Sequence, residues 1–425
     1  MEGTRSWLDN LKLRFSVGAL GNGNVDPYKF LPTMSIDKTG VIVGDGQVNY
    51  TSYPGLIPNN LTWEKVTTYD VGVDVDMFKN RLTIGFDWYR RNTTDMYTVG
   101  PTLPEVLGTT QPKGNYANLK TKGWELILSW RDNFKLAGSD FHYGVKFMLW
   151  DSQSWITKYN NATGKLSDYY EGYRIGDIWG YNIEGLFTSY DEIANHADQD
   201  YIKISDSKIW QPGDLKFADL NGDGKIDKGA QTLSDHGDLV IVGNEEERYH
   251  YGFNLNVGWK GIGISAFFQG VGKRDWYPGQ ETGFFWGKYN RPYGYSLKMH
   301  ENRWTEENPN PNAYWPRLVG YSSENGGRPM GTPNNRYMQD ASYLRLKALT
   351  VDYSLPQAWV SKLGLTGLKI YFTGENLFTF SNICENFDPE VIKGGDVDLK
   401  DRKGEEQGYS YPMLKTYTVG LNVSF

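Results

Sequence analysis

Ten segments of this chain alternate apolar and polar residues, as a β-strand lying between two different environments does. The carboxy-terminal segment shows the pattern most clearly: Tyr417, Val419, Leu421, Val423 and Phe425 are apolar, and the residues between them are small or polar. Each segment therefore predicts a strand with one apolar and one polar face. The strands are expected at residues 11–17, 69–76, 82–88, 124–130, 141–149, 249–259, 262–268, 342–354, 367–374 and 414–425.

The connections between these strands alternate strictly between short and long. The short ones are 78–80, 131–140, 260–261 and 355–366, and the long ones are 19–65, 93–121, 151–247, 271–341 and 376–413. Outer-membrane barrels have short periplasmic turns and long extracellular loops. Counted back from Phe425, every long connection falls outside. The pattern predicts an all-β fold, a transmembrane antiparallel β-barrel, rather than a soluble sandwich.

One predicted strand changes phase along its length. In the segment 342–354, Leu344 and Leu346 have one parity, whereas Leu349 and Val351 have the other. A single extra residue in one strand produces such a slip. We therefore expect a β-bulge near Lys347-Ala348.

The bulk composition narrows the class of protein further. The mean hydropathy of −0.58, without any run near the ~20 apolar residues of a spanning helix, excludes a membrane helix bundle. Aromatic residues make up 15% of the 425 residues, which suits the interfacial girdles of a barrel. The net charge of −7 argues against nucleic-acid binding. Cys384 is the single cysteine, so no internal disulfide can form, and we expect this thiol to be inert.

The start of the chain leads directly from Met1–Arg5 into a strand, with no signal peptide. A barrel bound for the outer membrane must first cross the inner membrane. We therefore expect either a mature segment or a longer protein whose amino-terminal part is missing.

The sharpest local motif is Asp219–Asp227, which matches a calcium-binding loop at positions 1, 3, 5, 6 and 9. Position 12, normally a bidentate acid, is Ala230, but Asp235 or Asp238 could replace it if 228–237 loops out. The alternative is a plain Asp/Asn/Gly turn in a polar external loop. The predicted calcium ligands are Asp219, Asn221, Asp223, the carbonyl of Lys225, Asp227 and Asp238. Such a site would rigidify the loop rather than catalyse a reaction.

The long connections are rich in aromatic residues beside Asn, Asp and Arg, a composition that suits stacking on sugars or packing on a partner protein. The alternative is that the rings pack the loops on one another or lie in the interfacial girdle. The candidates for substrate-binding or lid contact are Tyr173, Trp179, Tyr181, Trp276, Trp286 and Tyr289.

The sequence contains no recognisable catalytic constellation. The five histidines are scattered without the spacing of a zinc site, and there is no nucleophile elbow or phosphate loop. No two of the many carboxylates are marked out as a glycosidase pair. We therefore expect that the chain is not an enzyme.

Several further runs of residues are distinctive when taken together. They are Glu171–Tyr181, Asp219–Asp227, Tyr251–Leu255 with Phe267–Gly270, Arg303–Thr305, Tyr343–Lys347, Glu375–Thr379 with Asp388–Glu390, and Gly420–Phe425. In this order they resemble the carboxy-terminal part of SusC/RagA-type TonB-dependent outer-membrane transporters of Bacteroidota. In this family the last acid of the calcium-like loop usually follows closely. Here about eight extra residues intervene, which makes Asp238 the matching acid.

The resemblance implies that residues 1–425 form the carboxy-terminal portion of a barrel of roughly 22 strands, with 151–247 as a long extracellular loop. It implies a plug domain and a TonB-contacting segment outside this chain. It also implies a SusD-like surface lipoprotein as lid and import of an oligosaccharide, or of a peptide in some members, across the outer membrane of a Gram-negative bacterium. The alternative from another class is a surface glycan-binding or adhesion protein that does not transport. An enzyme is a third possibility, which hydrolysis by the purified chain would reveal.

Overall fold

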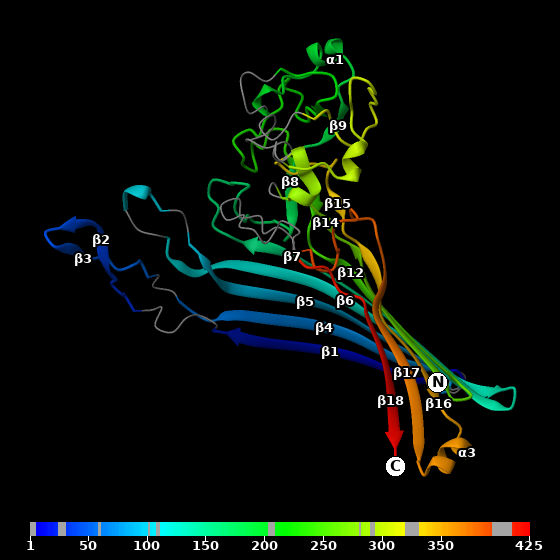
Figure 1. The fold of residues 1–425 in the computed structure, drawn as a ribbon. Coiled ribbons are helices and arrows are strands. Elements are labelled where there is room, and N and C mark those ends of the chain that lie inside the picture. The colour runs from blue at the N-terminus through cyan, green and yellow to red at the C-terminus, as the bar shows by residue number, and fades with distance from the viewer. Residues whose placement is uncertain are drawn as a thin grey trace.

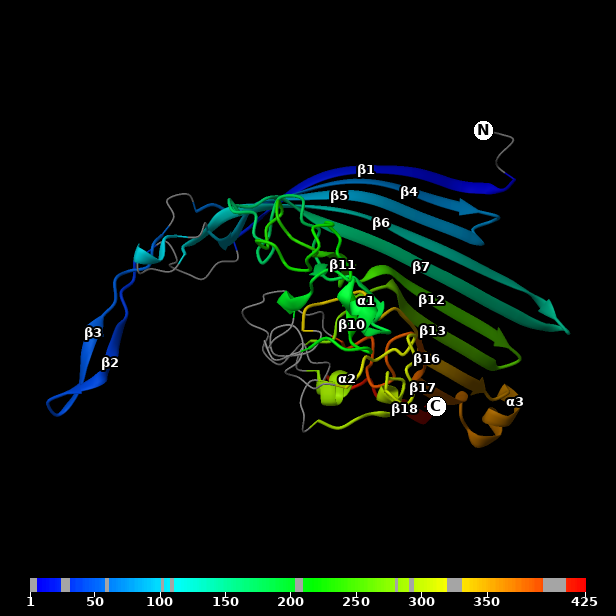
Figure 2. The same cartoon turned by 90° about the horizontal axis from the view of Figure 1, so that it is seen from above.

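The computed structural model describes residues 6–23, 31–57, 61–100, 103–107, 111–202, 209–279, 282–289, 294–318, 331–392 and 410–425. Its main feature is a curved ten-stranded sheet in which each strand pairs antiparallel with the next one along the chain (Figures 1 and 2). The strands are β1 (Leu8–Asn22), β4 (Glu64–Met77), β5 (Leu82–Val99), β6 (Lys113–Leu136), β7 (Ser139–Lys158), β12 (Arg248–Trp259), β13 (Ile262–Lys273), β16 (Tyr343–Ser354), β17 (Gly367–Ser381) and β18 (Thr416–Ser424). These are the ten expected strands, so the predicted all-β architecture is confirmed.

The register of the sheet keeps each face uniform. Phe86 on β5 lies opposite Leu126 on β6, which in turn lies opposite Leu149 on β7, so apolar side chains form continuous rows. On the other face, the Arg14 guanidinium on β1 pairs with Asp74 on β4 and with Asp87 on β5, each at 2.8 Å. One face therefore suits lipid and the other an aqueous lumen.

Aromatic residues mark both ends of the apolar face. Near the short turns, the Trp130 indole N–H donates to the Tyr143 hydroxyl at 3.0 Å. Toward the other end of the strands, Trp88 on β5 lies directly opposite Trp124 on β6. Aromatic rings at both limits of an apolar band are typical of the two membrane interfaces.

Two of the short turns contain only two residues. Ala137-Gly138 joins β6 to β7 and Lys260-Gly261 joins β12 to β13, and all four residues have positive φ. Such mirror-image turns match the twist of the paired strands. The expected turn at 131–140 was too long, because the strands continue to Leu136 and resume at Ser139.

Several strands extend far beyond the expected ~9–11 residues. Strand β6 has 24 residues and β7 has 20. As a result, the expected connection 93–121 shortens to the residues between Val99 and Lys113, and the first eight residues of 151–247 belong to β7. Outside the membrane both faces meet water, so apolar alternation is lost while backbone pairing continues.

The phase slip in β16 is a bulge, as predicted. Leu346 lies opposite Phe268 and Ala348 lies opposite Phe267, which leaves Lys347 as the extra residue. Against β17 the register shifts at the same place but in the other strand: Leu346 lies opposite Phe378 and Ala348 opposite Glu375, so there β17 contributes the extra residue. The 19–65 connection contains a separate hairpin of β2 (Ile36–Val43) and β3 (Gly46–Thr51).

Three of the long connections pack together into what we call the loop assembly, the described parts of residues 159–247, 274–342 and 382–392. It lies at the end of the strands away from the short turns (Figure 1). It contains β8 (Asp177–Gly180), β9 (Ile183–Leu186), α1 (Tyr190–Ala194), β10 (Leu215–Phe217), β11 (Val240–Asn244), β14 (Asp275–Trp276), α2 (Gly283–Trp286) and β15 (Gln339–Asp340). A short helix, α3 (Gln357–Val360), lies instead in the 355–366 turn. No helix in the described part of the chain is long and apolar enough to span a membrane.

Candidate functional site

Four of the six aromatic residues predicted to touch substrate or a lid are almost fully buried. Tyr181, Trp276, Trp286 and Tyr289 expose 1%, 1%, 2% and 1% of their surface and belong to the core of the loop assembly. Tyr289 stacks on Trp315 with ring centroids 5.0 Å apart. Rings enclosed by their own chain cannot stack on a ligand, so for these four residues the contact prediction is wrong. The alternative, packing of the loops on one another, is what the structure shows.

Tyr173 and Trp179 lie in a smaller cluster against the ten-stranded sheet, which we call the wall. Tyr173 packs with Tyr170 and with Ile156 of β7, and burial is the main cause that raises the pKa of its phenol. Trp179 on β8 is half-buried, and its indole N–H donates to the Tyr170 hydroxyl at 3.3 Å. Of the six predicted contact residues, Trp179 keeps the largest exposed surface and remains a candidate.

The calcium-like loop closes on itself through backbone hydrogen bonds. The Asp219 carboxylate accepts the N–H groups of Gly222 at 2.7 Å and Gly224 at 2.9 Å. The buried Asp238 carboxylate accepts those of Leu220 at 2.7 Å and Asp227 at 2.9 Å, so it joins the two ends of the motif.

The inserted residues 228–237 form a loop whose two ends meet, because the Asp238 N–H donates to the Asp227 carbonyl at 3.0 Å. Asn221 and Asp223 accept the N–H groups of Asp223 and Lys225, which makes a chain of Asx turns. The oxygen donors are of the type that calcium prefers. Within the described residues, however, no three acidic, histidine or cysteine side chains gather as a metal site, so calcium binding stays a prediction.

The polar face of the wall contains a charged cluster that sequence reasoning missed. It consists of Arg14 with Asp74 and Asp87. Elsewhere on the same face, the ring of His250 on β12 stacks on Trp150 of β7 with centroids 5.3 Å apart. The sequence did indicate that these residues share one face of the sheet, because each of them occupies a polar position in the alternation of its strand. What the parity alone could not show was which charges meet.

A buried ionic cluster fastens one segment of the loop assembly to the wall. Arg345 on β16, which is 3% exposed, pairs with Asp388 at 2.5 Å and also with Glu390, which accepts from Lys347 at 2.7 Å. Arg274, just beyond β13, donates to the Ile392 carbonyl at 2.6 Å. The segment 388–392 is thereby held against the ends of β13 and β16.

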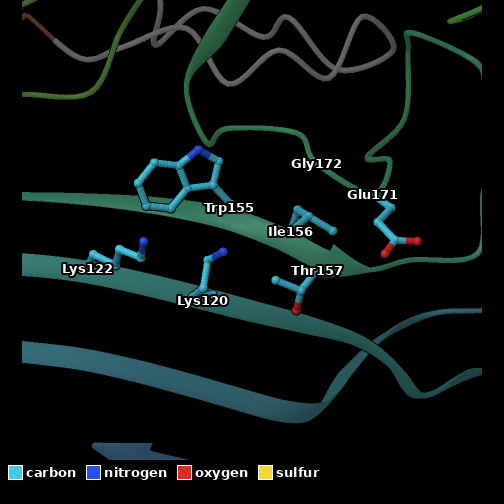
Figure 3. Close-up of a pocket in the computed structure, with 7 residues that line it drawn as sticks. All are labelled: Lys120, Lys122, Trp155, Ile156, Thr157, Glu171 and Gly172. Atoms are coloured by element: carbon cyan, nitrogen blue, oxygen red, sulfur yellow. The ribbon is translucent and has the colours of Figure 1, made fainter. Parts of the chain in front are cut away.

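A further cavity of about 300 Å³ opens on the outer parts of β6 and β7. Figure 3 shows Lys120 and Lys122 on β6 beside Trp155 on β7, with Glu171 at the far side. The Lys120 ammonium lies 5.7 Å from the centroid of the Trp155 ring. None of these residues was among the predicted site residues. Lys120, Lys122 and Trp155 lie in strand extensions that the sequence pattern did not reveal.

Comparison with known proteins places this wall and its loops in a family context. No family model matches the chain. TonB-dependent receptor P3 of Formosa agariphila is 29% identical over 97% of the chain and 39% of that receptor. TonB-dependent receptor SusC of Bacteroides thetaiotaomicron is 25% identical over 98% of the chain and 38% of that receptor. The chain therefore spans about two fifths of the length of these relatives.

Solved structures show the same fold. The structure of the RagAB peptide transporter superimposes with a TM-score of 0.71 at 23% identity, covering 99% of the chain and 41% of the transporter chain. The RagAB peptide importer in its 'closed-closed' state gives a TM-score of 0.69. The chain matches the carboxy-terminal part of a SusC/RagA-type TonB-dependent receptor, an outer-membrane β-barrel protein of Bacteroidota. The relatives are named as receptors and transporters, not as enzymes.

Proposed function

We propose that this chain forms the carboxy-terminal wall and outer loops of a TonB-dependent importer that carries an oligosaccharide across the outer membrane. The observation that supports import best is the two-faced sheet. Its apolar face is bounded by aromatic residues, and its other face holds the Arg14, Asp74 and Asp87 cluster, which suits a water-filled passage. In this proposal a TonB complex supplies the energy for import, as the names of the related TonB-dependent receptors suggest.

The loop assembly would serve as a rigid platform for a SusD-like surface lipoprotein. Its core is built from stacked and edge-to-face rings, including Trp286 with Tyr337 at 5.4 Å and Trp315 with Tyr337 at 5.2 Å. A platform with such a core keeps its shape, so a lid can open and close against a fixed surface. In this proposal no bond is made or broken by the chain, and the TonB complex acts on parts of the receptor outside it.

Peptide import by the same architecture is the second candidate. The oligosaccharide assignment is supported by the SusC relative and by the Asn-, Asp- and aromatic-rich loops, whereas the similar RagAB structure is that of a peptide transporter. A surface binding protein that does not transport is the remaining alternative.

The test is uptake by cells that carry the full-length receptor together with the neighbouring lipoprotein. Fluorescent oligosaccharides and fluorescent peptides are supplied separately, with and without a functional TonB gene. We expect TonB-dependent accumulation of the oligosaccharide in the periplasm. Accumulation of the peptide alone would establish the second candidate, and binding at the surface without accumulation of either would overturn import.

A further inference from the structure

A row of basic side chains continues the lipid-facing side of the wall just beyond its outer aromatic girdle. On β5 the lipid-facing residues end with Phe86 and Trp88, and the next residue of the same parity is Arg90. On β6 they end with Trp124, and the next residues of that parity are Lys122 and Lys120. The register is unbroken through this region, with Trp88 opposite Trp124 and Arg90 opposite Lys122.

These cations lie where like charges oppose each other across two strands. Arg90 and Lys122 are both exposed, and a directly opposed pair of like charges destabilises a sheet. Arg90 donates to the uncharged Asn92 side chain at 3.2 Å, and Lys120 lies over the Trp155 ring. Among the residues that the structure describes, no carboxylate forms an ion pair with any of the three. An anion from outside the chain would relieve this repulsion.

The neighbouring cavity gives the row a shape suited to a particular anion. Lys120 and Lys122 line it together with the flat ring of Trp155 and the hydroxyl of Thr157 (Figure 3). Ammonium groups bind phosphate through charge-assisted hydrogen bonds, and an indole ring offers a flat surface to a sugar. The combination suits a phosphorylated sugar.

The position of the row along the strands, relative to the membrane, indicates which molecule carries that sugar phosphate. It begins one residue pair above the Trp88–Trp124 pair, which marks the outer membrane interface, and it lies on the lipid-facing side rather than in the lumen. Headgroups of the outer leaflet occupy this level. We propose that Arg90, Lys120 and Lys122, with Trp155, bind the phosphate-bearing headgroup of an anionic glycolipid in the outer leaflet. The proposal rests on the membrane orientation of the sheet and not on which nutrient is imported.

The test is lipid binding by the full-length receptor, purified in neutral detergent and titrated with monophosphoryl lipid A under native mass spectrometry. The double variant R90Q/K122Q is compared with K79Q/K362Q, which removes two exposed cations at the short-turn end of the wall. Each basic residue near an anionic membrane surface strengthens lipid binding roughly fivefold. We therefore expect R90Q/K122Q to bind lipid A at least ~10-fold more weakly, and K79Q/K362Q to bind it as the unaltered receptor does.

Equal lipid A binding by R90Q/K122Q and the unaltered receptor would overturn the proposal. Displacement of lipid A by an equal concentration of free inorganic phosphate would also overturn it, because the site would then recognise the ion rather than the headgroup. So would loss of the co-purifying lipoprotein, or of receptor dimers, with lipid binding unchanged, since the row would then be a protein interface. Heat-dependent gel mobility checks that each variant is folded. If R90Q/K122Q does not fold, K120Q takes its place, with an expected loss of roughly fivefold.

Discussion

His300 is a buried side chain whose charge is controlled by its surroundings in the loop assembly. It is 2% exposed, its Nδ1 accepts the Leu297 N–H at 2.9 Å, and its Nε2 lies 2.8 Å from the Phe285 carbonyl. Burial is the main cause that lowers the pKa of this imidazole; the hydrogen bond with the Phe285 carbonyl opposes it, and the nearby Arg303 acts in the same direction as burial. The folded state therefore holds His300 neutral.

Acidification should weaken the loop assembly through this residue. The unfolded imidazole takes up a proton below about pH 6.5, and the folded one resists it, so the free energy of unfolding falls as the pH drops through that value. We expect faster limited proteolysis of the loop assembly at pH 5.5 than at pH 7.5, with a change in Trp315 fluorescence, since that ring lies 4.7 Å from His300. In H300Q the pH dependence should shrink even though the variant is less stable throughout. An unchanged pH dependence in H300Q would exclude this residue as the cause.

Asp238 determines whether the calcium-like loop keeps its shape. Replacement by alanine leaves the N–H groups of Leu220 and Asp227 without their acceptor, at a cost of about 1–3 kcal/mol for each group that stays buried. We expect faster amide hydrogen exchange across 219–227 in D238A than in the control D223N, whose amide oxygen can still accept the Lys225 N–H.

The same measurement tests the calcium prediction. If the loop binds calcium, adding the ion should slow exchange across 219–227 in the unaltered chain and should have little effect in D238A. Equal exchange with calcium and with a chelator would leave the motif as a chain of Asx turns.

Among structural elements, the segment 388–392 is held to the wall by a buried ionic cluster centred on Arg345. In R345Q the carboxylates of Asp388 and Glu390 lose the buried guanidinium, and breaking a buried ion pair by removing one partner costs about 3–5 kcal/mol. We expect rapid hydrogen exchange and proteolytic cleavage within 382–392, with the wall strands unaffected. The control is K369Q, which removes a more exposed ion pair with Asp352 near the short turns. Cleavage at the same rate in both variants would contradict the anchoring role of Arg345.

The element scale also shows where sequence patterns stop being informative. The bulge at Lys347 was predictable, because one extra residue inverts the parity of every apolar residue after it. The outer part of β5 was not, because Arg90, Arg91 and Asn92 carry no apolar alternation although the strand continues to Val99. A strand in water on both faces is specified by its backbone partners, which lie elsewhere in the chain.

For the molecule as a whole, the decisive feature is that β1 and β18 end the sheet. Within the described residues each pairs on one side only, with β4 and with β17. Unpaired backbone groups in lipid cost several kcal/mol each. We expect the 425-residue chain alone to show no heat-dependent gel shift in detergent, and to show one when the upstream part of the receptor is supplied. A shift for the chain alone would mean that the sheet closes on itself.

The wall could be predicted from the amino-acid sequence: its ten strands, their lipid and lumen faces, the sorting of loops to one end and the bulge at Lys347. These follow from local alternation, which each strand carries in its own residues. The role of the loop aromatics could be seen only in the folded chain, because the sequence around a tryptophan such as Trp286 does not show whether its side chain is buried or exposed. Only the folded chain likewise shows that Arg90 meets Lys122 and that Arg345 meets Asp388. Those contacts join residues distant in the chain, and no local pattern encodes which ones come together.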